Sequence, residues 1–315
     1  MSALHETQWR EWRSALASPR MHHAWILAGR KGLGKHDFAL AAARELVGAV
    51  RSALVTENDP DIHILTHLPK DEKEARKAEK GEDFETKRNI SIEQIRTMQA
   101  RLNTRPTLGE RRAIIINPAD DLERNAANAL LKSLEEPPVG TFFLLVTHRA
   151  GMLLPTIRSR ARILRFNPLP IGAVEATLRA GAGEHGPADI AIAAQASGGA
   201  PGAGEALLSQ KLGAAEALMR RIATEGDPDF TLRGKLGEEI GARPDRERIA
   251  TTLDLARTVL ARRLEQPSRS EIPALVEAHA RLVTISGQAK SYNFDPGFLA
   301  MEIGTLLASA APLRA

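Results

Sequence analysis

The sequence has no cysteine among its 315 residues. Disulfide bonds and zinc sites built on thiolates are therefore excluded, and the cytoplasm is the expected compartment. No apolar run reaches the roughly 18 residues that a membrane-crossing helix needs. The first twelve residues, MSALHETQWREW, lack the apolar stretch of a signal peptide. We therefore expect a cytoplasmic protein without a membrane partner.

Aromatic side chains are also scarce, at 4% of the sequence, whereas apolar side chains reach 43%. That apolar share is enough to build hydrophobic cores, and a chain of this length suits two or three domains. Basic and acidic residues nearly balance, which leaves a formal net charge of +4. This mild basic bias permits contact with nucleic acid but does not by itself indicate it.

Apolar, strand-like runs alternate with helical patterns in the first half of the chain. Such alternation favours βαβ units and a largely parallel sheet. The charged stretch from Pro69 to Arg88 is expected to be a solvated insertion, part helix and part loop. The expected strands are 24–28, 62–65, 113–117, 142–147 and 162–166, and the expected helices between them are 35–47, 92–102 and 124–136.

Beyond residue 168 only helical periodicity remains, interrupted by a glycine- and proline-rich stretch at 196–206. The sequence therefore predicts three parts. An α/β domain occupies 1–167, a small helical unit occupies 168–206, and an all-helical domain occupies 207–315.

A phosphate-loop motif, G-x-x-x-x-G-K, follows the first expected strand and precedes the first expected helix of the α/β pattern. In such a loop, glycine backbone approaches a polyphosphate closely and the lysine contacts its β- and γ-phosphates. We therefore assign Gly29, Gly32, Gly34 and Lys35 to a nucleotide-binding-like loop. The alternative is a glycine-rich turn unrelated to phosphate.

The residues that would hold magnesium are missing from the sequence. The position after Lys35 is serine or threonine in active phosphate loops, but here it is His36, and imidazole is a poor ligand for Mg²⁺. The expected strand at 113–117 ends in Asn117 and is followed by Pro118, where an acidic ligand and a catalytic base are needed. The motif is therefore predicted to be vestigial, without a metal site or ATP hydrolysis of its own.

Two carboxylates lie just beyond that strand, at Asp120 and Asp121. We interpret them as N-capping residues of the next helix rather than as catalytic groups.

Three segments together resemble the clamp-loader branch of the AAA+ superfamily. They are ILAGRKGLGK, AIIINPADDLERNAANALLKSLEEPP and FFLLVTHRAGMLLPTIRSRAR, and the resemblance covers about residues 20–170. It implies an AAA+ P-loop sheet domain, a small helical lid and an all-helical collar used for oligomerisation. Within this branch, the degenerate loop and the missing acidic strand end are similar to the delta-prime class, whereas gamma/tau subunits keep both sites.

The resemblance also implies roles and partners. The family's Ser-Arg-Cys motif stands here as Ser159-Arg160-Ala161, so Arg160 is implied to act in trans as an arginine finger in the neighbouring subunit's ATP site. The implied partners are gamma/tau ATPase subunits, a delta subunit, the sliding clamp and primed DNA, within the DNA polymerase III holoenzyme. No cofactor of its own is implied, because ATP and magnesium are used by partner subunits, and the four-cysteine zinc module of related subunits is absent.

Three alternatives stay open. Arg160 could belong to a solvated basic strand edge together with Arg158, Arg162 and Arg165. The chain could be an active ATPase of the gamma/tau type, which His36, Asn117 and Pro118 oppose. It could also be a P-loop small-molecule kinase, for which the sequence offers neither an acceptor site nor metal ligands.

Overall fold

The structure is a computed structural model, and it describes residues 4–48, 59–102, 104–181, 183, 185–265, 267–289 and 294–312. The chain divides into two compact units, Met1–Pro168 and Leu169–Ala315, each with its own hydrophobic core. Among the helices of the described residues, none combines the length and the apolar character needed to span a membrane.

The first unit is built on a five-stranded sheet in which every neighbouring pair is parallel. The strand order is β2-β3-β4-β1-β5, so β4 lies between β1 and β3. This confirms the predicted parallel α/β sheet, and the observed bounds differ from the predicted ones by one residue at β3, β4 and β5. The strands are β1 (Ala24–Ala28), β2 (Ile62–Leu65), β3 (Arg112–Ile116), β4 (Thr141–Thr147) and β5 (Arg162–Arg165).

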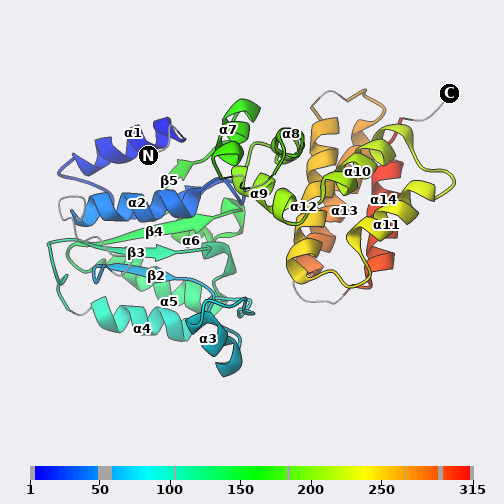
Figure 1. Cartoon of the computed structure of the whole chain (residues 1–315). Coiled ribbons are helices and arrows are strands. Elements are labelled where there is room, and N and C mark those ends of the chain that lie inside the picture. The colour runs from blue at the N-terminus through cyan, green and yellow to red at the C-terminus, as the bar shows by residue number, and fades with distance from the viewer. Residues whose placement is uncertain are drawn as a thin grey trace. The chain divides into compact units, whose positions relative to one another are not determined.

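Helices cover both faces of this sheet (Figure 1). On one face lie α1 (Glu6–Leu16) and α2 (Lys35–Val47), and on the other lie α4 (Ile92–Leu102) and α5 (Arg124–Glu135). The central strands are therefore buried on both sides and read as continuous apolar runs. Trp25 of β1 packs edge-on against Trp12 of α1, with ring centroids 5.4 Å apart.

The face under α4 and α5 holds one large apolar cluster. Each fully buried aliphatic side chain contributes about 1.5–3 kcal/mol, so this cluster fixes the helices firmly against the sheet. Its members come from the strands, from α4 and α5, and from α6 (Pro155–Arg158), and they include Ile26, Ile114, Ile116, Phe143, Leu145, Ile95, Leu130, Leu134 and Ile157.

The charged segment is part helix and part loop, as predicted. Its helix is α3 (Glu72–Glu79), and Asp71 caps the start of that helix. The Asp71 carboxylate accepts a hydrogen bond from the Glu74 backbone N–H at 3.0 Å. Glu74 in turn accepts from the Glu85 backbone N–H at 2.7 Å. This bond joins the helix to the loop that follows it in the same segment, and Glu74 is buried rather than solvated.

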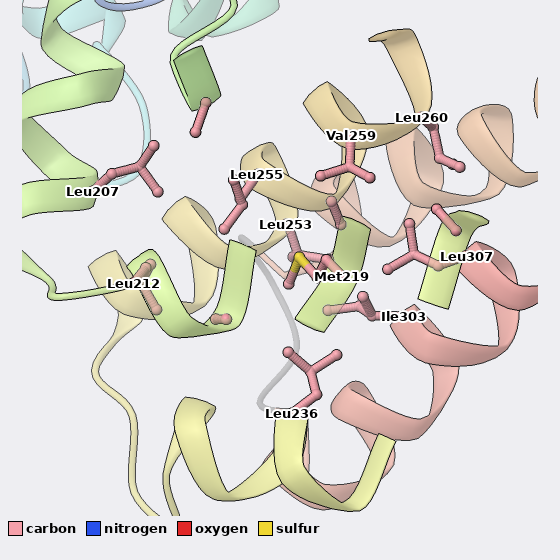
Figure 2. Packing of buried hydrophobic residues seen from close by; sticks show 14 of the residues in the cluster. Leu207, Leu212, Met219, Leu236, Leu253, Leu255, Val259, Leu260, Ile303 and Leu307 are labelled. Carbon is pink, nitrogen blue, oxygen red and sulfur yellow. The ribbon is translucent and has the colours of Figure 1, made fainter. Parts of the chain in front are cut away.

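The second unit is all-helical. One continuous apolar cluster runs through it, from Val174 to Ala310. Figure 2 shows part of this cluster, with Met219, Leu253 and Ile303 among its labelled members. The helices are α7 (Ile171–Gly181), α8 (Pro187–Ala196), α9 (Pro201–Ser209), α10 (Gly213–Glu225), α11 (Thr231–Ile240), α12 (Arg246–Arg263), α13 (Ile272–Gln288) and α14 (Pro296–Ser309).

Helix starts in this unit follow local chemistry. Asp245 and Asp295 accept hydrogen bonds from backbone N–H groups three residues ahead, at 2.6 and 2.9 Å, and so cap α12 and α14. The predicted boundary at 206–207 falls inside α9, and the core is continuous across it. The division into a lid at 168–206 and a collar at 207–315 therefore stays a prediction.

Gly140, in the turn between α5 and β4, provides a test of this fold. Its φ is +77°, and a Cβ there would lie 2.1 Å from the Glu110 carbonyl oxygen. Gly140→Ala combines backbone strain with a clash against main chain, and we expect it to lower the free energy of unfolding by at least about 2–3 kcal/mol. Gly81→Ala is the matched control, because Gly81 has φ +71° with nothing within 4 Å, and should cost only about 1–2 kcal/mol. Equal losses in urea unfolding would contradict the clash.

Candidate functional site

The phosphate loop lies at the carboxyl edge of the sheet, where all five parallel strands end. It connects β1 to α2, and α2 begins at Lys35 directly after Gly34. Gly32 and Gly34 have φ of +82° and +70°, a region that glycine adopts without strain. A Cβ on Gly29 would lie 2.4 Å from the Phe166 carbonyl oxygen. A positive φ at two of these positions and a close backbone contact at the third therefore explain why each is glycine.

The Lys35 side chain bonds back to the phosphate loop that precedes it. This side chain is buried, and its Nζ donates hydrogen bonds to the carbonyl oxygens of Gly29 at 2.7 Å and Arg30 at 2.5 Å. Burial lowers the pKa of Lys35 to about 8, and the nearby Asp120 carboxylate opposes this shift. In the observed conformation the ammonium group satisfies the loop's own carbonyls.

His36 and Asn117 stand where sequence analysis placed them. His36 is in the first turn of α2, and its Nδ1 is buried without a hydrogen-bond partner among the described residues. Asn117 comes directly after β3, and its backbone N–H donates to the Leu65 carbonyl at 2.9 Å. Neither residue offers a charged or hydroxyl oxygen of the kind that Mg²⁺ prefers.

The capping role predicted for Asp120 and Asp121 is wrong. Both lie in a short 3₁₀ turn, η2 (Ala119–Asp121), whereas α5 begins at Arg124 after Glu123 and has no side-chain cap. Asp121 instead lies 3.3 Å from Nε2 of His67. The aspartates are too far from the helix start to cap it, because the chain first passes through this turn.

Asp120 instead fastens the end of β4 to the turn after β3. One carboxylate oxygen accepts hydrogen bonds from Thr147 Oγ1 at 2.6 Å and from the Arg149 backbone N–H at 3.1 Å. The other oxygen accepts from the His148 backbone N–H at 2.5 Å. This role could not be read from the sequence, because the partners are 27 to 29 positions away.

The residues around the loop do not fit a magnesium ion. The nearest acidic group after β3, Asp120, already accepts three hydrogen bonds, and His36 and Asn117 supply no anionic oxygen. Within the described part of the chain, no group of three or more histidine, aspartate or glutamate side chains could hold a metal ion. We therefore derive no metal-dependent step at this site.

His148 adds no positive charge to this edge at neutral pH. Burial, together with the nearby Lys35 ammonium, lowers its pKa to about 4, while Asp120 opposes the shift. Lys35 thus faces a neutral imidazole and an aspartate that is already hydrogen-bonded.

The start of α1 lies against the loop, a contact that sequence analysis missed. His5 Nε2 is 2.6 Å from the Leu33 carbonyl oxygen, and Gln8 donates to the Arg165 carbonyl at 2.6 Å. The His5 ring also packs edge-on against Phe166, with centroids 4.8 Å apart. A single histidine before a helix does not predict such a contact from the sequence.

Arg160 lies just after α6, which buried Ile157 fixes in the core beneath α5. Its guanidinium is 2.7 Å from the Glu135 carboxylate. It also donates to the Thr156 carbonyl at 3.0 Å and to Ser159 Oγ at 3.3 Å. The arginine makes no hydrogen bond to the phosphate loop among the described residues, so the two predicted groups are not brought together within this chain.

Two of the neighbouring arginines, Arg158 and Arg162, differ from Arg160 in their contacts. Arg158 is exposed, and its guanidinium has no ion pair among the described residues. Arg162 pairs with Glu11 at 2.8 Å and lies over the Trp25 ring at 5.0 Å. In Arg160 alone of these three, the guanidinium binds acceptors on both α5 and the α6 turn.

The parallel sheet order and the loop after β1 define an AAA+ P-loop unit. A family profile described as DNA polymerase III, delta subunit matches residues 4–170. The chain belongs to that family.

Curated relatives agree with this assignment. DNA polymerase III subunit delta′ of Pseudomonas aeruginosa is 30% identical over 182 residues, covering 54% of this chain and 50% of the relative. DNA polymerase III subunit tau/gamma of Haemophilus influenzae is 31% identical over 153 residues, covering 47% of this chain and 20% of the relative. The chain spans about half the length of the delta′ relatives it matches. The resemblance to the delta-prime class predicted from the sequence is confirmed.

Among solved structures, a DNA polymerase III gamma subunit-related protein from Thermotoga maritima aligns with a TM-score of 0.49 at 19% identity. The alignment covers 96% of this chain and 98% of that one. A likeness this loose adds nothing to the assignment, which rests on the sheet order and the family match.

The lowered pKa of Lys35 predicts a pH effect on stability. The folded chain binds this proton less tightly than the unfolded chain, so the free energy of unfolding rises with pH between about 8 and the ordinary lysine value of about 10.4. Relative to Lys35→Met, which cannot titrate, the wild-type chain should gain roughly 1–2 kcal/mol from pH 8 to pH 10. Urea unfolding of both proteins across this range measures the gain. A difference that stays constant from pH 7 to pH 10 would show that Lys35 titrates normally.

Proposed function

We propose that this chain is a clamp-loader subunit of the DNA polymerase III holoenzyme that does not hydrolyse ATP itself. In this role it helps gamma/tau ATPase subunits and a delta subunit to load the sliding clamp onto primed DNA. The observation that carries the proposal is the phosphate loop, whose lysine donates hydrogen bonds to the loop's own carbonyls and which has His36 and Asn117 at the positions where magnesium ligands are expected.

The second part of the proposal concerns Arg160. A phosphoryl-transfer site needs positive charge where negative charge develops, and an arginine finger from a neighbouring subunit supplies it. Arg160 makes no hydrogen bond to its own chain's loop among the described residues, and its side chain is 35% exposed. These features favour action on a neighbouring subunit's ATP site rather than on its own.

The alternative is an active ATPase of the gamma/tau type, and a tau/gamma relative does show comparable identity. The site favours the non-hydrolysing role. Loss of metal charge stabilisation removes several kcal/mol of transition-state stabilisation, and loss of a general base alone costs about 10²–10⁴ in rate. His36 and Asn117 together remove the magnesium ligands that such an ATPase needs.

The first functional prediction is that the isolated chain does not hydrolyse ATP. With magnesium present, phosphate release should stay at the level of buffer, because His36 and Asn117 offer neither a charged or hydroxyl oxygen for Mg²⁺ nor a carboxylate base. A reconstituted gamma/tau subunit in the same assay is the positive control. Magnesium-dependent turnover at about 1 s⁻¹ or faster, within the ordinary enzyme range, would support the alternative function.

The second functional prediction concerns Arg160→Ala in the reconstituted complex. An arginine finger contributes about 10³–10⁵ to the rate at its own site. Total clamp-stimulated hydrolysis should therefore fall in part, because other sites remain active, and clamp loading should fall further. Folding should be unchanged, since a surface ion pair contributes about 0–1 kcal/mol.

Two variants sharpen this test. Arg160→Lys should rescue poorly, because an ammonium lacks the planar fork that matches phosphate oxygens. Arg158→Ala is the matched control, since its side chain is exposed and two residues away. Wild-type loading by Arg160→Ala beside impaired Arg158→Ala would assign the finger to Arg158, and normal loading by both would leave only a scaffold role.

A further inference from the structure

Arg160 does not extend freely into solvent. Its guanidinium is held by three acceptors: the Glu135 carboxylate at 2.7 Å, the Thr156 carbonyl at 3.0 Å and Ser159 Oγ at 3.3 Å. Thr156 and Ser159 are sequence neighbours in the α6 turn, but Glu135 is the last residue of α5. The ion pair therefore joins two elements of the fold.

The two ends of this ion pair rest on the same hydrophobic core. Leu134, next to Glu135, is 1% exposed, and Ile157, three residues before Arg160, is also 1% exposed. Both belong to the apolar cluster under α4 and α5. The core fixes the backbone at both positions, so only the two side chains remain to be ordered.

The observed contacts leave part of the guanidinium available. An arginine carries five N–H donors. Here Nη1 donates to Thr156 and Ser159 while Nη2 approaches Glu135, and Nε has no hydrogen-bond partner among the described residues. Glu135 thus fixes one side of the group and leaves N–H donors for a phosphate.

We propose that Glu135 is a positioning residue for Arg160, which orients the guanidinium before the chain meets the ATP site of its neighbour. This inference rests on the proposed trans-acting role of Arg160. A long side chain that is already ordered loses less rotamer freedom when it engages its target. Holding a charged group in place in advance is also the usual source of electrostatic stabilisation in a transition state.

If Glu135 inhibited Arg160 instead of positioning it, removal of Glu135 would change the reaction rate in the opposite direction. A carboxylate that merely neutralises Arg160 would compete with phosphate for the same guanidinium, and its removal would accelerate the neighbour's reaction. A positioning residue, by contrast, slows that reaction when it is removed. The direction of the change therefore decides between the two roles.

The experiment compares Glu135→Gln with Glu136→Gln in the reconstituted complex, with ATP, clamp and primed DNA. Glu136 is the matched control, because it is adjacent and exposed and has no ion pair among the described residues. We expect Glu135→Gln to lower the rate of clamp loading about two- to fivefold, the range that an exposed ion pair can supply. The KM for ATP and the assembly of the complex should not change, and Glu136→Gln should behave as wild type.

Combination with Arg160→Ala separates this inference from the proposed function. If Glu135 acts through Arg160, Glu135→Gln adds no further loss in that background. An additional loss there, an unchanged rate or a faster rate in the single variant would each overturn the positioning role while Arg160→Ala remains impaired. A complex in which Arg160→Ala itself loads normally would instead overturn the trans-acting role on which the inference rests.

Discussion

Burial of the central strands on both faces is the constraint on which the rest of the first unit depends. Ile26, Leu27, Ile115 and Leu144 are each 0% exposed, so β1, β3 and β4 cannot shift in register without exposing apolar surface to water. Because all strands are parallel, that fixed register places the loop after β1, Asn117 after β3 and Thr147 at the end of β4 along one edge. The geometry of the site is a consequence of core packing.

The same edge of the sheet carries two opposite charges, those of Lys35 and Asp120, that the fold satisfies separately. An ammonium and a carboxylate left near each other in a partly buried place are costly unless each finds partners. Lys35 satisfies its charge on the Gly29 and Arg30 carbonyls, and Asp120 satisfies its charge on the end of β4. Lys35 therefore stabilises the loop, and Asp120 joins the end of β4 to the turn after β3.

Local patterns were sufficient to predict the framework. The bounds of β1, β2, α2 and α4 are those expected from the sequence, because periodicity indicates each element and glycines border β1 and α2. Gly29, Gly32, Gly34 and Lys35 also lie where the motif placed them, since the strand–loop–helix context determines that loop.

Contacts between distant residues were not predictable in this way. The bond from Thr147 to Asp120 spans 27 positions, and that from His5 to Leu33 spans 28. The pairing of Arg160 with Glu135 depends on how α6 docks against α5. Such contacts follow from tertiary packing, which no short-range pattern encodes. The aspartates after β3 were misread for the same reason, because a local rule favoured capping.

Lys35 and Arg160 of the first unit lie in opposite kinds of local environment. Lys35 is buried, and two of its three N–H donors bond to backbone carbonyls of its own loop. Arg160 is partly exposed and retains unbonded N–H donors, yet its position is fixed by a core-anchored helix and by Glu135. The backbone of the loop thus fixes Lys35, whereas Arg160 is ordered and still keeps N–H donors for a further contact.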